Sequence, residues 1–442
     1  GKDLTKLSEK EKQKLWGTKF SYVAQSAAAA FNPAHRLLNQ TIESSMSHNL
    51  ETKENLQQEA IQLYKEMQLP NPEKIGNRYP HQVSGGQLQR TMTAMAMTSK
   101  PDLIIFDEPT TALDVTTQVN VLETIRSIVK EHQTAAIYIT HDLAVVAQMA
   151  DRIQVLRYGE TIEIAETKKM LKSPKQEYTK SLWAVRSIHK KEQTSDENVL
   201  RIENIDASYG SGPMVLKNIN INVPIGRTVA IVGESGSGKS TTARAITGLL
   251  PPISGKVIFK GRELPTKLSS RSKEDLRRIQ MVYQSPDTSM NPRHTVRDII
   301  GRPLKFYHGL VGDKYIKKII ELLKMIELDE SFIDRLPEEL SGGQKQRICI
   351  ARALAAEPDL IICDEVTSAL DQIVQEGILK LLLRLQEELS ISYIFITHDI
   401  ATVKAIADEV VVMHQGLVVE QGLKKDIFSP PYPDYTELLL SS

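Results

Sequence analysis

Cysteine is scarce in this chain of 442 residues, which contains only Cys349 and Cys363. So few thiols argue against a disulfide scaffold, a thiolate zinc site and an iron–sulfur cluster. They favour a reducing, cytoplasmic setting. Long apolar runs are also missing, because the longest, such as VVVM at 410–413, fall far short of the ~20 residues that span a bilayer.

Neither positive nor negative charge dominates the composition. Lys and Arg number 55 and Asp and Glu number 55, so the formal net charge is zero. A neutral chain has no general attraction to nucleic-acid phosphates, and no nucleic-acid partner is predicted. The 25% charged and 41% hydrophobic residues are typical of a globular protein, and the length predicts two or three domains.

What the sequence does contain is a long internal repeat. Three segments return 257 residues later with nearly the same residues: HQVSGGQLQR (81–90) as EELSGGQKQR (338–347), PDLIIFDEPTTALD (101–114) as PDLIICDEVTSALD (358–371), and YITHDLAVV (138–146) as FITHDIATV (395–403). A constant offset over this distance indicates two homologous copies of one domain in tandem.

The two copies begin differently. The second copy has a section from VLRIENIDASYG (199–210) onward that precedes the repeated segments, whereas Gly1-Lys-Asp-Leu already aligns with Gly261-Arg-Glu-Leu. We therefore expect the chain to be a piece of a longer two-copy protein whose first copy has lost its opening section. The predicted regions are a first copy without a phosphate loop (1–165), a short helical tail and a solvated linker (166–198), a complete second copy (199–425) and a C-terminal tail (426–442).

A glycine-rich loop in the second copy fits the phosphate-binding motif G-x-x-x-x-G-K-[ST]. The segment 227–250 reads as a buried strand, a loop and a helix. Glycines let backbone N–H groups turn toward phosphate oxygens, and the helix N-terminus adds positive charge. We expect Lys239 to bridge the β- and γ-phosphates and Ser240 to ligate Mg²⁺. The predicted nucleotide-binding residues of the loop are Gly233, Glu234, Ser235, Gly236, Ser237, Gly238, Lys239, Ser240 and Thr241.

Candidate catalytic residues follow three further predicted strands. LIICDE ends in two carboxylates, of which Asp364 would hold Mg²⁺ and Glu365 would polarise the attacking water. Gln284 would orient water or Mg²⁺, and His398 would bond the γ-phosphate. A surface acidic pair and a structural histidine are the simpler alternatives. The corresponding residues of the first copy are Gln25, Asp107 and the catalytic candidates Glu108 and His141.

The segment LSGGQ, present in both copies, predicts the start of a helix. A serine at the N-cap and two glycines would let a phosphate approach bare N–H groups, although a cap without a ligand is the alternative. The residues concerned are Ser84, Gly85, Gly86 and Gln87 in the first copy and Ser341, Gly342, Gly343 and Gln344 in the second. Tyr209, which we place before the first pair of strands, is a candidate for stacking on adenine; an ordinary strand-end tyrosine is its alternative.

In this order the motifs GESGSGKST, Gln284, SGGQ, IICDE, SALD and His398 resemble the ATP-binding cassette (ABC) ATPases of transporters. The resemblance implies an α/β P-loop fold, with a RecA-like core, an antiparallel β subdomain and an α-helical subdomain, in two tandem copies of which the first is incomplete. It implies ATP and Mg²⁺ as cofactors. It also implies head-to-tail pairing of cassettes, so that Ser84, Gly86 and Gln87 would complete the site at Lys239, with Asp114 approaching across the interface. The other site would pair Gln25, Asp107, Glu108 and His141 with Ser341, and at most one intact site would form within this chain.

A finer resemblance is to the peptide/nickel importer branch. It rests on QSAAAAFNP and QSPDTSMNP after the two glutamines, and on the tails SPKQEYT and SPPYPDYT, which depart from the branch's HPYT. It implies an ATPase that powers import of di- or oligopeptides, a nickel chelate or glutathione from the cytoplasmic face of the plasma membrane. Integral membrane permease subunits would be direct partners, touching the helical stretches 41–69 and 313–328, and a solute-binding protein an indirect one. A soluble twin-cassette translation factor and an inactive remnant remain as alternatives.

Overall fold

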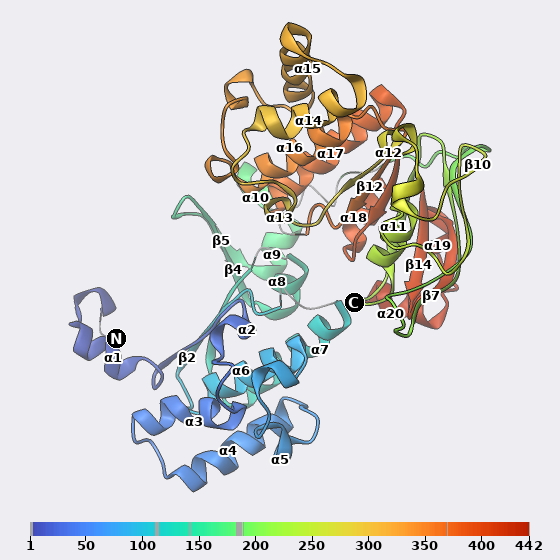
Figure 1. The fold of residues 1–442 in the computed structure, drawn as a ribbon. Helices are drawn as coiled ribbons and strands as arrows, with labels where there is room; N and C mark the ends of the chain where they lie inside the picture. Colours follow the sequence, from blue (N-terminus) through green and yellow to red (C-terminus); the bar gives the residue numbers. More distant parts are fainter. Residues whose placement is uncertain are drawn as a thin grey trace. The chain divides into compact units, whose positions relative to one another are not determined.

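The computed structural model describes residues 3–110, 115–140, 143–182, 188, 190–368 and 370–441. The chain forms two compact units, Gly1–Thr179 and Lys180–Ser441, each built around its own core (Figure 1).

The first unit combines a parallel three-stranded sheet with a group of helices. Strands β1 (Phe20–Val23), β2 (Leu103–Asp107) and β3 (Ala135–Ile139) pair in that order. β4 (Arg152–Arg157) and β5 (Glu160–Glu166) form an antiparallel hairpin of their own. The described helices, including short 3-10 turns, are η1 (Leu4–Lys6), α1 (Glu9–Leu15), α2 (Ala27–Ala30), α3 (Leu37–Ser47), α4 (Lys53–Glu66), α5 (Pro72–Ile75), η2 (Pro80–Gln82), α6 (Gly85–Met97), α7 (Val115–Glu131), α8 (Leu143–Met149), α9 (Thr167–Lys172) and α10 (Glu177–Leu182), the last of which crosses the boundary between the units.

The second unit is organised on a six-stranded sheet with the order β11-β12-β13-β8-β14-β15. The first five strands are parallel and β15 is antiparallel to β14. Strands β8, β12 and β13 are buried at every residue, as expected for central parallel strands covered on both faces. The bounds are β8 (Thr228–Val232), β11 (Ile279–Val282), β12 (Leu360–Asp364), β13 (Ser392–Ile396), β14 (Glu409–His414) and β15 (Leu417–Leu423).

A second, antiparallel sheet has the order β10-β9-β6-β7. Its strands are β6 (Asn198–Ser208), β7 (Met214–Pro224), β9 (Ser254–Phe259) and β10 (Arg262–Glu263). Tyr209 lies in the turn between β6 and β7. The expectation that it precedes this strand pair is therefore wrong, because β6 already begins at Asn198 and the pair closes at the SYG turn.

Helices cover the core sheet and extend from it as a helical region, which shares one hydrophobic core with one face of the sheet. The helices of the second unit are α11 (Lys239–Thr247), η4 (Leu268–Ser270), α12 (Lys273–Arg278), α13 (Pro286–Ser289), α14 (Val296–His308), α15 (Gly312–Met325), η5 (Glu330–Phe332), η6 (Pro337–Glu339), α16 (Gly342–Leu354), α17 (Gln372–Leu389), α18 (Ile400–Ile406), α19 (Lys424–Ile427) and α20 (Asp434–Ser441). The unit thus has the three parts that the sequence predicts.

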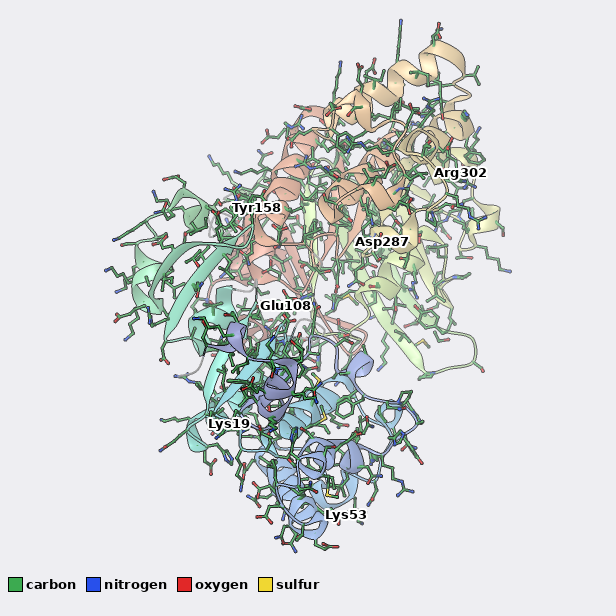
Figure 2. All side chains as sticks on the ribbon, turned by 90° about the vertical axis from the view of Figure 1, so that its left-hand side faces the viewer. Lys19, Lys53, Glu108, Tyr158, Asp287 and Arg302 are labelled. Carbon is green, nitrogen blue, oxygen red and sulfur yellow. The ribbon has the colours of Figure 1, made fainter. Side chains whose placement is uncertain are left out.

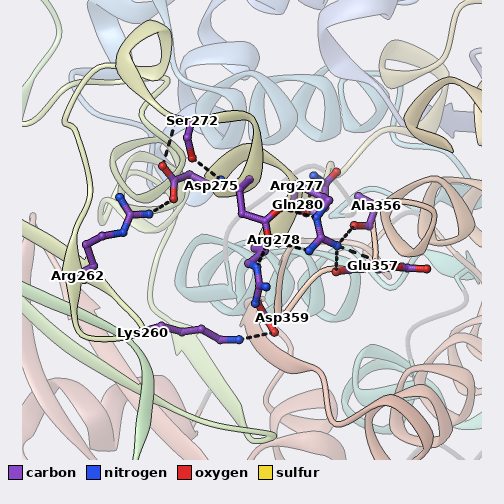
Figure 3. Close-up of polar contacts among 11 residues, drawn as sticks. Lys260, Arg262, Ser272, Asp275, Arg277, Arg278, Gln280, Ala356, Glu357 and Asp359 are labelled. Atoms are coloured by element: carbon purple, nitrogen blue, oxygen red, sulfur yellow. Dashed lines mark hydrogen bonds and ion pairs between the residues drawn. The ribbon is translucent and has the colours of Figure 1, made fainter. Parts of the chain in front are cut away.

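A cluster of charged residues ties the antiparallel sheet to the core sheet (Figure 3). Asp359, which precedes β12, accepts a 2.7 Å hydrogen bond from Lys260 at the end of β9. Its second oxygen accepts a 2.8 Å bond from Arg278 of α12. Arg262 of β10 also pairs with Asp275 of α12. These bonds hold α12 against both sheets, directly before the chain enters β11 of the core sheet.

The two predicted helical stretches are helical. The stretch 41–69 contains the end of α3 and all of α4, which Thr52 caps by accepting from Asn55 N–H, and the stretch 313–328 corresponds to α15. The expectation about the linker needs correction. The linker is not solvated throughout. Ile188 packs against the main core of the second unit, and the Lys190 side chain is only 13% exposed. Hydrogen bonds to Asp408 and Gln386 of the unit keep Lys190 in place.

Candidate functional site

The phosphate loop joins β8 to α11 in the second unit, as the motif predicts. Gly233 and Gly238 have φ angles of 147° and 108°, a region that side chains rarely adopt. A Cβ at Gly233 would lie 2.1 Å from the Met413 carbonyl oxygen, so glycine is also required for this close approach to β14. The loop is therefore held between β14 and the start of α11.

Lys239, the first residue of α11, is 6% exposed and turns back over the loop. Its ammonium donates to the carbonyls of Gly233 at 2.7 Å and Glu234 at 2.8 Å. Ser237 is 3% exposed. Its hydroxyl is one of the buried polar groups, among the described residues, that have no hydrogen-bond partner. A buried hydroxyl and a buried ammonium on one glycine-rich loop fit a phosphate ligand.

Ser240 connects this loop to the end of β12. Its hydroxyl donates a 3.0 Å hydrogen bond to Asp364, which is 9% exposed. Burial raises the pKa of Asp364, partly offset by the bond from Ser240. A hydroxyl and a carboxylate oxygen side by side are ligands that Mg²⁺ accepts, with the remaining positions left to waters and phosphates. Among the described residues no three His, Cys, Asp or Glu side chains gather as a separate metal site.

Glu365, directly after β12, is the centre of a second group. Its carboxylate accepts a 2.6 Å hydrogen bond from the Gln284 amide and lies 3.5 Å from Nδ1 of His398. The contact with His398 lowers the pKa of Glu365, and the same contact raises the pKa of His398. Glu365 has a φ of 50°, an unusual value for a side-chain-bearing residue, and its N–H donates to Ile396 O at 2.9 Å. The structure thus brings Gln284, Glu365 and His398 together at the carboxyl ends of three neighbouring strands.

Tyr209 also reaches the loop helix. Its hydroxyl lies 3.4 Å from that of Thr241 and accepts a 2.8 Å bond from Arg244, whose guanidinium is 5.9 Å from the ring centre. The side chain remains 46% exposed. Its position beside α11 leaves the ring available for stacking, and Arg244 is a neighbour that the sequence analysis did not predict.

Both LSGGQ segments cap helices as predicted. At the start of α16 the Ser341 hydroxyl accepts from Gln344 N–H, and the Gln344 side-chain oxygen accepts from Ser341 N–H. Ser84 and Gln87 form the same pair of bonds at the start of α6. The two glycines of the second copy differ. A Cβ at Gly343 would lie 2.3 Å from Val374 of α17, whereas at Gly342 it would meet only Leu370 at 3.7 Å. Gly343 is therefore also a packing residue, for which the motif alone gave no signal.

The first unit repeats the glutamine–glutamate contact. Gln25 donates to Glu108 at 2.7 Å. Glu108, which is labelled in Figure 2, directly follows β2 and has a φ of 44°. Asp107 accepts a 2.5 Å bond from the Tyr22 hydroxyl. His141 and Asp114 lie outside the described residues. Ser84 and Lys239 belong to different units, and the approach of one to the other stays a prediction.

One contact of the phosphate loop was missed. Tyr435 in the C-terminal tail accepts a 3.0 Å hydrogen bond from Glu234 N–H. The only sequence signal was that SPPYPDYT resembles SPKQEYT, which shows that each copy carries a tail but not where the tail lies.

The sequences of both units match a family of known proteins. The family model for the ABC transporter matches residues 1–111 and 216–368, more than half of the chain. The chain belongs to the ABC transporter family. The glutathione import ATP-binding protein GsiA of Shigella dysenteriae is 36% identical over 483 aligned residues, covering 100% of this chain and 77% of that protein. GsiA of Escherichia coli K12 is also 36% identical, over 479 aligned residues with the same coverage.

Solved ABC cassettes are similar to one half of the chain. CbiO1 of Clostridium perfringens, part of the transporter complex CbiONQ, is 33% identical with a TM-score of 0.48, covering 53% of this chain and 91% of that one. The cassette MJ0796, in a dimeric post-hydrolysis state with ADP and Pi, is 33% identical with a TM-score of 0.45, covering 51% and 98%.

Family membership confirms several predictions. The chain has the ABC-cassette P-loop fold, and it is an ATPase of the ABC importer type that uses ATP and Mg²⁺. The two matched segments of the family model are consistent with two cassettes in this chain. The likeness to glutathione import ATP-binding proteins over the whole chain supports the importer prediction over the translation-factor alternative. In the part of the chain that the structure describes, no helix combines the length and apolar character needed to cross a membrane.

Proposed function

We propose that the second cassette binds Mg·ATP in the loop Gly233–Thr241 and hydrolyses it at Glu365, and that this chain thereby powers uptake of glutathione or another small peptide. The arrangement that carries the catalytic part of the proposal is the convergence of Lys239, Ser240–Asp364 and Gln284–Glu365–His398 at one edge of the core sheet. Ligands of open α/β sheets bind at this edge, outside the carboxyl ends of the parallel strands.

Each residue then has a distinct task. The N–H groups of the loop and the start of α11 bind phosphate oxygens, and Lys239, which its two carbonyl partners hold over the loop, contacts the β- and γ-phosphates. Ser240 and Asp364 hold the Mg²⁺ ion, which when bound neutralises charge on the phosphates. A carboxylate with a lowered pKa is ionised near neutral pH, so Glu365 is ready to polarise the attacking water, while Gln284 and His398 orient it.

The first cassette completes the site in this proposal. The capping boxes use the N–H groups of Ser84 and Gln87 on α6 and of Ser341 and Gln344 on α16, so the N–H groups of the two glycines at each helix start are the ones that a phosphate can approach. Such a terminus is suited to the γ-phosphate of a nucleotide held by another cassette. Glu108 and Gln25 would serve the second site of the pair, together with His141.

The ATP-binding step is tested with one lysine variant. Lys239→Ala should abolish Mg·ATP binding by isothermal titration calorimetry, whereas Lys256→Ala, which removes an exposed lysine from β9, should bind as the parent does. If Lys239→Ala binds Mg·ATP with the parent's affinity, the loop is not the nucleotide site.

Cargo and partners require the membrane components. The relatives named above are glutathione import proteins, which supports glutathione as the first solute to test. We expect the full protein to co-purify with integral membrane permease subunits at the cytoplasmic face of the plasma membrane, with a solute-binding protein delivering the cargo. Proteoliposomes holding that complex should take up labelled glutathione with ATP, and should lose uptake with Lys239→Ala. Uptake of a labelled dipeptide but not of glutathione would show that the transported solute is a peptide other than glutathione.

A further inference from the structure

The C-terminal tail of the second unit is docked beside the phosphate loop. Helix α20 buries Leu439, which is 2% exposed, in a small core with Ala230 and Val232 of β8. Thr436, 1% exposed, donates a 2.6 Å hydrogen bond to Glu420 of β15. Since β8 leads directly into the phosphate loop, a helix packed on β8 and β15 brings its first turn to that loop.

Tyr435, at the start of α20, contacts the loop itself. Its hydroxyl oxygen accepts a 3.0 Å hydrogen bond from Glu234 N–H. Its ring lies 4.1 Å, centre to centre, from the ring of His414 at the end of β14. The residue before His414, Met413, is the one whose carbonyl approaches Gly233. The tyrosine therefore touches both the loop and the strand end that supports the loop.

The peptide group between Gly233 and Glu234 is held at both ends. Its carbonyl, Gly233 C=O, accepts from the Lys239 ammonium at 2.7 Å, and its N–H donates to Tyr435. Lys239 also bonds the next carbonyl, that of Glu234, at 2.8 Å. A peptide group is planar, so fixing its N–H fixes the direction of its carbonyl as well. Tyr435 thus determines the orientation of the group that holds Lys239.

We infer that Tyr435 is a positioning residue for ATP binding: the C-terminal tail pre-organises the phosphate loop and Lys239 through the Glu234 N–H. The inference rests on the proposed assignment of this loop to the phosphates of ATP. A loop already held in one conformation has less conformational freedom to lose on binding, so the tail increases affinity for the nucleotide without touching it.

The first unit docks its tail in a similar way. Tyr178 corresponds to Tyr435 at the 257-residue offset, and Arg157 corresponds to His414. The Arg157 guanidinium lies 4.6 Å from the centre of the Tyr178 ring, and Thr179, the counterpart of Thr436, is fully buried. The tail tyrosine therefore lies against the same strand end in both units, which indicates that tail docking belongs to the repeated domain.

The tail offers a matched control for the test. Tyr432, three residues earlier, donates its hydroxyl to Phe428 O within the tail at 3.2 Å and has no described bond to the loop. Tyr435→Phe and Tyr432→Phe each remove one hydroxyl and keep the ring. A general loss of tail packing would affect both variants alike, and only the Tyr435 variant loses a bond to the loop.

The experiment measures KM and kcat for ATP hydrolysis and the midpoint of thermal unfolding. Loss of one hydrogen bond predicts that Tyr435→Phe raises KM by about two- to tenfold. We expect kcat and the unfolding midpoint to match those of Tyr432→Phe. Equal KM values for the two variants would overturn the inference, and so would a fall in kcat with KM unchanged. If Lys239→Ala still binds ATP, the loop is not the ATP site and the proposed function fails. If Lys239→Ala loses ATP binding but the two tyrosine variants have equal KM values, only the inference about Tyr435 fails.

Discussion

The side-chain amide of Gln284 donates a 2.6 Å hydrogen bond to the carboxylate of Glu365, and Gln25 makes the same bond to Glu108 at 2.7 Å. Both glutamates have positive φ angles, 50° and 44°, and both N–H groups donate at 2.9 Å to the neighbouring parallel strand. Residues held in sparsely populated conformations cost free energy and cluster at functional sites. Two units that share this conformation and this partner are built to present a carboxylate at the same place.

Glu365→Gln should separate ATP binding from hydrolysis. The amide is nearly the same size as the carboxylate but is a poor base, so we expect kcat to fall by ~10²–10⁴ while Mg·ATP binding is retained. Calorimetry with Mg·ATP and a phosphate-release assay measure the two quantities. Glu388→Gln, which changes an exposed glutamate at the end of α17, is the control and should leave kcat unchanged. Parental kcat in the Glu365 variant would contradict the assigned role.

The contact between His398 and Glu365 predicts a pH dependence of stability. Because the pKa of His398 is raised in the folded state, this residue adds to the free energy of unfolding. The addition is complete below pH 6.5, the ordinary pKa of histidine, and is lost as the pH rises through the folded-state pKa. The lowered pKa of Glu365 also adds to the free energy of unfolding. This addition is complete above pH 4.5, the ordinary pKa of glutamate, and is lost as the pH falls through the folded-state pKa. Their sum is largest between these two values. Asp399 acts in the same direction on His398, and Lys239 opposes it.

His398→Gln removes that titration and tests its sign. The difference in unfolding midpoint between the parent and the variant should be greatest at about pH 5 to 6 and should shrink toward about pH 9. Scanning calorimetry over this range measures it. A difference that stays constant across the range would show that the histidine contributes no ionisable contact.

The sequence predicted the site better than it predicted the connections around it. Motif spacing located the loop, the carboxylates after β12 and both serine caps, because each depends on residues close together in the chain. Tyr435 and Glu234 are 201 residues apart, and Lys190 and Asp408 are 218 apart. A tail tyrosine and a linker lysine carry no local signal of such a partner. Tertiary packing determined both, and it overturned the expectation of a linker solvated throughout.

The two glycines of the second LSGGQ segment should differ in their effect on stability. Gly343→Ala would place a Cβ 2.3 Å from the β-branched Val374, and overpacking of this kind typically costs ~1–3 kcal/mol. Gly342→Ala has room, with its nearest neighbour at 3.7 Å, and alanine favours a helix over glycine by ~0.5–1 kcal/mol. The midpoint of urea unfolding should therefore lie at a higher urea concentration for Gly342→Ala than for Gly343→Ala. Identical midpoints would mean that Val374 moves aside without cost.

Lys190 anchors the linker to the second unit through a buried charge pair. Its ammonium donates to Asp408 at 2.5 Å and to Gln386 at 2.6 Å, and the Asp408 side chain is fully buried. Asp408 also accepts from Thr228 N–H at 2.9 Å and Gln193 N–H at 3.2 Å, so the linker supplies two of its bonds. Burial lowers the pKa of Lys190, and the pairing with Asp408 opposes that shift.

Removing one partner of a buried pair leaves the other charge without compensation. We therefore expect Lys190→Met to lower the free energy of unfolding of the second unit by about 3–5 kcal/mol, toward the lower figure because two N–H donors to Asp408 remain. Lys191→Met is the matched control, since Lys191 is the next residue and is exposed, and it should unfold at the parental midpoint. Chemical denaturation followed by circular dichroism measures both. Equal stability of the two variants would show that this pair does not anchor the linker. The sequence-based expectation of a solvated linker would then hold for the segment around residue 190.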